Sequence, residues 1–142
     1  MTEEELVNTA RLISRLAHKG QTDRAGKPYA RHPEKVASFL ADPAAQCVAY
    51  LHDVLEDTDV TREELQKIFG DRITDAVWLL TRPAHMEYMD YIRRLKENPL
   101  ARSVKLADLR HNMDLSRIPN PSTRDRKRVE KYKAARALLL QE

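Results

Sequence analysis

Glycine and proline divide this chain into helix-length segments and leave little room for a β-sheet. There are only three glycines, and all seven prolines fall between periodic segments or at the first turn of one, which is where helical proteins tolerate proline. The segments show helical periodicity, with no strand-like alternation and no runs of β-branched residues. The chain is therefore predicted to be all-α, a single compact domain over residues 1–142 with about eight helices.

Capping signals place the helix boundaries. Thr2 with Glu5, and Thr61 with Glu64, form capping boxes that open helices. Gly20 ends the helix that begins at Thr2, and Gly70 ends the helix that begins at Thr61. The other helices are expected from Pro33, from Pro43 to about Glu56, and over 71–81, 85–97, 99–116 and 122–140.

Several side chains can be assigned to the core or the surface. Leu16 is expected to face inward, and Trp78, between Val77 and Leu79, is expected in the core. Tyr88 and Tyr91 share a helix face and are expected to keep their hydroxyls at the surface. The lone Cys47 is interpreted as a small buried residue rather than a nucleophile.

Composition restricts the functional classes. With 42% hydrophobic and 33% charged residues, the chain is typical of a globular protein, and its apolar runs are too short to span a membrane. The acidic N-terminal residues are not expected to form a signal peptide, and a single cysteine favours a cytoplasmic location. A net charge of +3 is too weak to indicate nucleic acid as a partner, and none is expected. The basic residues of 124–136 are interpreted as a solvated helix face, with a phosphate-contacting surface as the alternative.

One stretch combines ionisable and apolar residues. His52, Asp53, Glu56 and Asp57 lie among Leu51, Val54 and Leu55, and burying such groups costs several kcal/mol unless they are paired or bound to a cation. On a continuous helix the three acids share one side, and His52 lies about 100° from Asp53. Histidine nitrogen with carboxylate oxygen suits Mn, Fe, Zn or Ni. Two ligands do not make a site, so others must come from elsewhere.

Two further segments offer ligands. Asp108 follows a Leu-Ala pair and precedes Asn112 by one turn, and His32 lies just before a predicted helix start. Each has an ordinary alternative: His32 as a loop or capping residue, Asp108 as the ion-pair partner of Lys105 or Arg110, and Glu56 and Asp57 as a solvated helix end. The joint pattern is much more specific than any single member.

The order His32…His52-Asp53…Asp108 resembles the H…HD…D signature of HD-domain metal-dependent phosphohydrolases. A narrower resemblance is to the (p)ppGpp hydrolase domain of Rel/Spo enzymes and their small stand-alone relatives. It is carried by residues 17–21, 26–33, 51–58, 61–65 with 69–70, and 104–108 with 111–113. This resemblance implies one Mn²⁺ held by His32, His52, Asp53 and Asp108. It also implies that Glu56 and Asp57 activate and orient the attacking water, and that Asn112 lines the substrate pocket.

Two positions depart from the pattern of the alarmone hydrolases. Asp23 stands where the family usually has an arginine after the Gly-Gln pair, and Asp114-Leu115 replaces Arg-Thr. Each change puts an acid where a polyanionic ligand is usually met by a cation. Arg24, Lys27 and Arg110 are the candidates to compensate, and the first two are assigned to substrate binding.

The resulting hypothesis is a hydrolase of a phosphorylated nucleotide, first (p)ppGpp with release of its 3′-pyrophosphate, then others such as NADPH. The alternative motivated by Asp23 and Asp114 is a metal-containing nucleotide-binding or sensory module with little turnover. A third hypothesis is a nucleic-acid adaptor that uses the basic C-terminal helix. A homo-oligomer is possible, and the sequence does not specify one.

Overall fold

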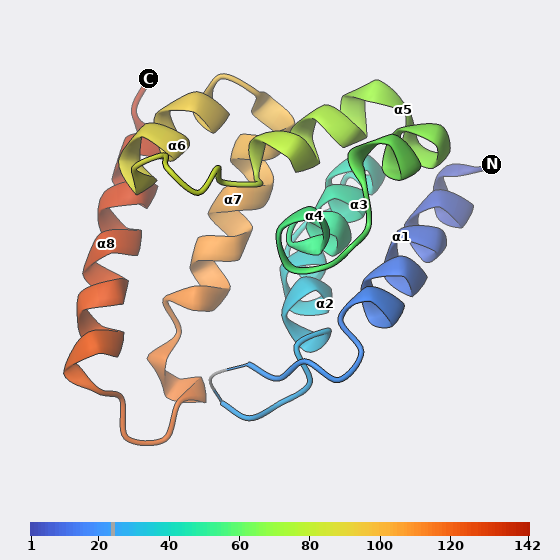
Figure 1. The fold of residues 1–142 in the computed structure, drawn as a ribbon. Helices are drawn as coiled ribbons and strands as arrows, with labels where there is room; N and C mark the ends of the chain where they lie inside the picture. The colour runs from blue at the N-terminus through green and yellow to red at the C-terminus, as the bar shows by residue number, and fades with distance from the viewer. Residues whose placement is uncertain (24) are drawn as a thin grey trace.

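The computed structural model describes residues 1–23 and 25–142, and these form a bundle of α-helices (Figure 1). The helices are α1 (Glu3–Ala17), α2 (Arg31–Ser38), α3 (Pro43–Leu51), α4 (Val54–Asp57), α5 (Arg62–Leu79), α6 (Tyr88–Lys96), α7 (Pro99–Asn112) and α8 (Thr123–Leu140), with a 3₁₀ turn, η1 (Leu115–Arg117), after α7. Among the described residues there is no strand, only an isolated bridge between Thr22 and Pro28. The all-α prediction and the number of helices are confirmed.

The predicted caps account for several helix ends. Thr2 and Thr61 each form a complete capping box, and Ser122 with Asp125 forms a third at the start of α8. Gly70 has φ 78° and ψ 178°, a conformation that residues with a side chain rarely adopt, and it kinks α5 into two helical pieces. The prediction that Gly70 separates two helices is thus confirmed.

Helix α3 lies at the centre of the molecule and organises the core. It packs against α1, α2, α5 and α7, while α8 covers α6 and α7 on the other side (Figure 1). Val48, Ala49 and Leu51 of α3 are completely buried, and so is Cys47 to within 1%. Because α3 is enclosed on several sides, residues 52 and 53, which follow its C-terminal end, lie in the interior of the bundle.

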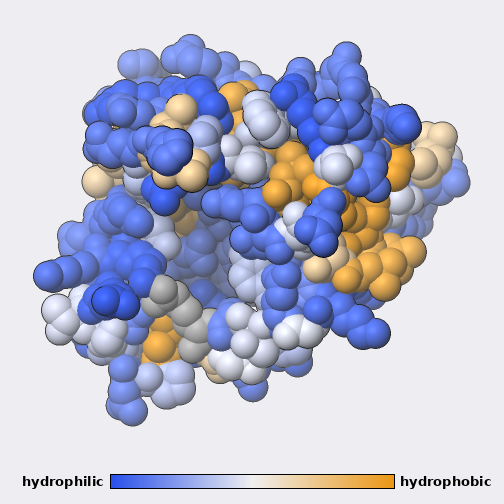
Figure 2. Space-filling view, in the orientation of Figure 1, coloured by the Kyte–Doolittle hydropathy of each residue, from blue (hydrophilic) through white to orange (hydrophobic). Residues whose placement is uncertain are grey.

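Two apolar residues expected in the core lie at the surface. Leu16 is 66% exposed because α1 buries the face carrying Ala10 and Ser14, from which Leu16 is turned by roughly 200°. Trp78 is 43% exposed and stacks under the Arg62 guanidinium, 4.8 Å from the ring centroid. Figure 2 shows hydrophobic side chains gathered on the α1 and α4 side of an otherwise hydrophilic face.

The tyrosines of α6 are also buried more deeply than expected. Tyr91 is 4% exposed, and its hydroxyl donates to the Leu80 carbonyl at 2.8 Å. The Tyr88 hydroxyl is buried as well, without a hydrogen-bond partner among the described residues. The prediction that both hydroxyls lie at the surface is therefore wrong, because α8 and the end of α5 cover this face of α6.

The predicted helix from Pro43 to about Glu56 is interrupted. Helix α3 ends at Leu51, and α4 begins at Val54, with Asp53 at φ −104° and ψ −1° between them. Similarly, α2 begins at Arg31, before the predicted start at Pro33, so His32 lies in its first turn instead of in the loop. Helix α7 ends at Asn112, and the described chain contains no helix able to span a membrane.

Candidate metal centre and adjoining cavity

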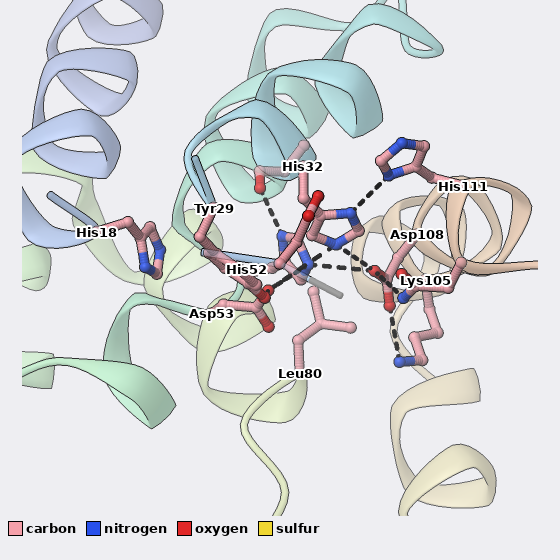
Figure 3. A network of polar contacts seen from close by, with 12 residues as sticks. His18, Tyr29, His32, His52, Asp53, Leu80, Lys105, Asp108 and His111 are labelled. Atoms are coloured by element: carbon pink, nitrogen blue, oxygen red, sulfur yellow. Dashed lines mark hydrogen bonds and ion pairs between the residues drawn. The ribbon is translucent and has the colours of Figure 1, made fainter. Parts of the chain in front are cut away.

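Segments that are distant in sequence meet at the end of α3 (Figure 3). His32 comes from the first turn of α2, and His52 and Asp53 come from the break between α3 and α4. One ligand atom from each of these three residues lies within 4.8 Å of the other two. The histidines are 5% and 3% exposed, so this is a buried cluster of imidazole and carboxylate groups.

Asp108, from the last turn of α7, completes the cluster. Its Oδ1 lies 2.8 Å from His32 Nε2 and 3.3 Å from His52 Nε2. The same oxygen accepts a hydrogen bond from Asn112 Nδ2 at 3.0 Å, and Oδ2 pairs with Lys105 Nζ at 2.8 Å. One oxygen is thus occupied by Lys105, while the other faces the two histidines.

Contacts outside the cluster fix the orientation of its members. His52 Nδ1 donates to the Ala49 carbonyl at 2.6 Å, which leaves Nε2 directed at the cluster. The Tyr29 hydroxyl donates to Asp53 Oδ2, and the His18 ring lies beside that of Tyr29. Outer contacts of this kind hold metal-ligating histidines and carboxylates in place.

The cluster fits a divalent cation on chemical grounds. His52 Nε2 is buried and forms no well-aligned hydrogen bond in the part of the chain that the structure describes, although Asp53 Oδ2 and Asp108 Oδ1 lie 3.1 and 3.3 Å away. A buried nitrogen without a partner is costly, and a bound cation would satisfy it. Two imidazoles and two carboxylates form a donor set suited to Mn, Fe, Zn or Ni.

The electrostatics of the cluster depend on opposite charges. Burial alone raises the pKa of the Asp108 carboxyl, but the Lys105 ammonium and His52 hold that pKa well below its usual range. Burial likewise raises the pKa of Asp53, yet His52 lowers it to below the ordinary range. Both carboxyls are therefore ionised at neutral pH and available as ligands.

A cavity of about 210 Å³ opens from the cluster on the side of α6 and α8. Besides His52 and Asp53, its walls carry three cations, a carboxylate, an amide and three phenols, contributed by Arg82, Lys105, Lys131, Glu56, Asn112, Tyr88, Tyr91 and Tyr132. Lys131 Nζ lies 4.6 Å from the Tyr88 ring centroid. A cavity of this composition, beside two histidines and two acids, can accept a phosphorylated ligand.

Two cationic residues of the cavity are not identified by the sequence motifs. Arg82 lies between α5 and α6, and Lys131 lies on α8, far along the chain from any ligand. The one available signal is the basic run over 124–136. Lys131 is itself exposed, as the interpretation of that run as a solvated helix face expects, and it also lines the cavity.

The two candidate acids of α4 face different spaces. Glu56 lines the cavity, and burial together with the nearby Asp53 raises its pKa. Asp57 lines a neighbouring recess with Gln21, whose side-chain amide donates to the Asp57 carbonyl at 3.3 Å. Burial and Asp53 also raise the pKa of Asp57. The structure therefore brings Glu56, more than Asp57, to the mouth of the cluster.

The predicted substrate-binding residues are separated. Asn112 lines the cavity and contacts Asp108, while Lys27 lines a different recess, of about 470 Å³, behind His111. Arg24 lies outside the described residues. Arg110 is exposed and stacks on Phe39, with its guanidinium 3.9 Å from the ring centroid.

The two acids that depart from the alarmone-hydrolase pattern have local structural roles. The Asp23 carboxylate accepts from the main-chain nitrogens of Ala25 and Lys27 at 2.9 and 3.0 Å, and it lies 3.6 Å from Arg117. The Asp114 carboxylate caps η1 by accepting from the Ser116 main-chain nitrogen at 3.0 Å. Neither is among the described residues that line the 210 Å³ cavity.

An all-helical bundle with a buried cluster of two histidines and two aspartates defines a class of metal-binding domain. The model of the HD domain family matches residues 10–135, and the chain belongs to this family. HD domains bind divalent metals, in agreement with the cluster of His32, His52 and Asp53.

The chain is also similar to curated and solved proteins. It is 33% identical over 119 residues to the bifunctional (p)ppGpp synthase/hydrolase SpoT of Escherichia coli, and 34% identical over 125 residues to the GTP pyrophosphokinase rsh of Brucella melitensis. These matches cover 73% and 78% of this chain but only 17% of each relative. A solved structure of a metazoan ortholog of SpoT, which is described as hydrolysing ppGpp, has a TM-score of 0.75 at 24% identity. That match covers 96% of this chain and 85% of the other, and it supports the fold.

Proposed function

We propose that this chain is a metal-dependent phosphohydrolase that removes the 3′-pyrophosphate from guanosine-3′,5′-bis(diphosphate). The observation that carries the proposal is the opening of a buried histidine–aspartate cluster into a cavity with three cations and a carboxylate. The relatives support the substrate, because a 33% identical protein of Shigella flexneri is named guanosine-3′,5′-bis(diphosphate) 3′-pyrophosphohydrolase.

We assign the metal to His32, His52, Asp53 and Asp108, and we propose Mn²⁺ as the ion. A divalent cation bound there would supply a water of lowered pKa and would neutralise charge on the phosphoryl oxygens. The buried, unsatisfied His52 Nε2 and the ionised carboxyls of Asp53 and Asp108 support this assignment.

The residues of the cavity have distinct proposed roles. Arg82 and Lys131 bind the phosphate groups, and Lys105 keeps Asp108 ionised and oriented. Glu56 takes a proton from the attacking water and returns it to the leaving oxygen, a task suited to a carboxyl whose pKa is raised. Asp57 assists by orienting the water from the adjacent recess.

Neither Asp23 nor Asp114 argues against a polyanionic substrate. Both carboxylates are engaged by main-chain nitrogens in their own turns, and neither is among the described residues that line the cavity. Repulsion of the scissile phosphates by these acids is therefore not expected.

To test the proposal, the protein is loaded with Mn²⁺, and the release of phosphate and pyrophosphate is measured for a panel of nucleotides. Pyrophosphate is expected from (p)ppGpp, and His52→Ala and Asp53→Ala are expected to abolish its release. His85→Ala is the matched control, because His85 is exposed and lies outside the cavity lining. Activity that survives in the His52 and Asp53 variants would contradict the proposed centre.

Two variants separate the acids of α4. Glu56→Gln is expected to lower kcat about 10²-fold or more, as removal of a general base does. Asp57→Asn is expected to lower kcat less, because Asp57 faces the adjacent recess. A larger loss in Asp57→Asn than in Glu56→Gln would reverse the assignment.

The same panel distinguishes the alternative functions. Phosphate release from NADPH without pyrophosphate release from (p)ppGpp would identify a different nucleotide as the substrate. Nucleotide binding detected by calorimetry without any product would favour a sensory module over an enzyme.

A further inference from the structure

The second ring nitrogen of His32 faces another histidine. Its Nδ1 lies 2.7 Å from Nδ1 of His111, which follows Asp108 on α7 by one turn (Figure 3). The two ring planes differ by 17°, and the ring centroids are 5.0 Å apart. The centroid separation is close to the nitrogen–nitrogen distance plus the distance from each nitrogen to the centre of its own ring. The two nitrogens therefore lie on the line between the ring centres, and the rings meet edge to edge in nearly one plane. That is the geometry of an N–H···N hydrogen bond.

A single proton occupies the space between the two nitrogens, so one ring donates and the other accepts. Without a cation, His32 Nε2 donates to the ionised Oδ1 of Asp108, 2.8 Å away. With a cation bound, Nε2 must instead offer it a lone pair, and His32 can do so while donating from Nδ1 to His111. If His111 donates instead, neutral His32 carries its proton on Nε2, and that proton blocks the position of a metal ligand. Only the first arrangement leaves His32 able to bind a cation.

We propose that His111 is a positioning residue for the metal centre. It accepts the Nδ1 proton of His32 and thereby fixes both the tautomer and the ring orientation in which Nε2 faces the ion. The inference rests on the proposed metal function. His111 is 8% exposed and belongs to the lining of the 470 Å³ recess. It is not among the residues described as lining the substrate cavity, so its role is toward the metal.

The two histidines of the cluster are oriented by different kinds of acceptor. His52 donates its Nδ1 proton to the Ala49 carbonyl, a main-chain group that a substitution cannot remove. His32 relies on a side chain. Replacing His111 therefore removes the acceptor of one ligand and leaves the other ligand unchanged, which makes the contribution of this acceptor measurable.

The matched variants are His111→Leu and His111→Asn, which have side chains of similar shape and size. Asparagine can place its carbonyl oxygen near the position of Nδ1 and so retain an acceptor, whereas leucine cannot. The apparent affinity for Mn²⁺, measured by calorimetry, is expected to fall about 10- to 100-fold in His111→Leu and by less than about threefold in His111→Asn. Equal affinity in wild type and His111→Leu, or equal losses in the two variants, would overturn the inference.

A second measurement needs no variant and no activity. In Zn²⁺-loaded protein with ¹⁵N-labelled histidine, NMR should detect a proton on His32 Nδ1 with a coupling across the hydrogen bond to His111 Nδ1. A proton attached to His111 Nδ1, or no coupling, would contradict the proposed direction of the bond. Wild-type protein that binds neither Mn²⁺ nor Zn²⁺ would contradict the proposed function as well. If the wild-type protein binds the metal and His111→Leu binds it equally well, only the role of His111 would be contradicted.

Discussion

Lys105 and Asp108 form a buried ion pair, whose contribution to stability can be compared with that of an exposed pair of the same spacing. Lys105 Nζ lies 2.8 Å from Asp108 Oδ2, at a spacing of three residues, and the two side chains are 11% and 6% exposed. On α6, Arg93 and Asp90 have the same spacing and a distance of 2.7 Å, but they are 59% and 58% exposed. The two pairs share their spacing and differ in burial, and they also differ in the order of the charges along the helix and in the cation.

The magnitudes follow from the dielectric surroundings. At 2.8 Å two unit charges attract by about 6 kcal/mol at an effective dielectric constant of about 20, and by only about 1.5 kcal/mol in water. Removing one partner of a buried pair costs about 3–5 kcal/mol, because the other charge stays buried without compensation. An exposed pair contributes about 0–1 kcal/mol. Lys105→Met, which keeps the length of the stem, should therefore lower the free energy of unfolding by about 3–5 kcal/mol.

The assay is urea denaturation at pH 7 in EDTA, followed by circular dichroism. The lowered pKa of Asp108 and the raised pKa of Lys105 keep both groups charged at this pH, so the pair contributes in full. Arg93→Met should cost less than about 1 kcal/mol. In a double-mutant cycle, Lys105→Met should cost much less in an Asp108→Asn background. Equal costs for the Lys105 and Arg93 variants, or a negligible coupling energy in the cycle, would refute the reasoning.

Three further outcomes are expected. Burial raises the pKa of the Cys47 thiol to about 11, so a thiol reagent such as DTNB at pH 8 should label it only as the protein unfolds, and rapid labelling of native protein would contradict this. Tyr91→Phe leaves the buried Leu80 carbonyl without its donor and should cost about 1–3 kcal/mol in urea denaturation; an unchanged midpoint would contradict it. Burial, with Arg82 and Lys105, lowers the pKa of Lys131. In the proposed role, Lys131 binds phosphate only when it is charged. As the pH increases, KM for (p)ppGpp should therefore begin to rise at a pH below the ordinary lysine pKa of about 10.4, and Lys131→Arg should remove this rise.

The helical fold was predictable because its signals are local. Capping boxes at Thr2 and Thr61, and the left-handed conformation at Gly70, depend on residues within one or two turns of each other. The cluster was also visible in the sequence: His52 and Asp53 stand beside apolar residues, where buried ionisable groups require compensation, and His32 and Asp108 complete the joint pattern. Which face of a helix is covered depends on its neighbours, and this is why the predictions for Leu16, Trp78 and the hydroxyl of Tyr91 are wrong.

The sequence by itself determined the all-helical class, the capping boxes at Thr2 and Thr61, and the four residues that form the buried cluster. The tertiary structure decided which side chains support that cluster. The pairing of His32 with His111, and the arrival of Arg82 and Lys131 at the cavity, depend on how α2, α7 and α8 pack. The physical reason is the distance along the chain over which each effect acts. Helix caps and periodicity act within a few residues, whereas the histidine–aspartate cluster and its cavity are assembled from segments that only packing brings together.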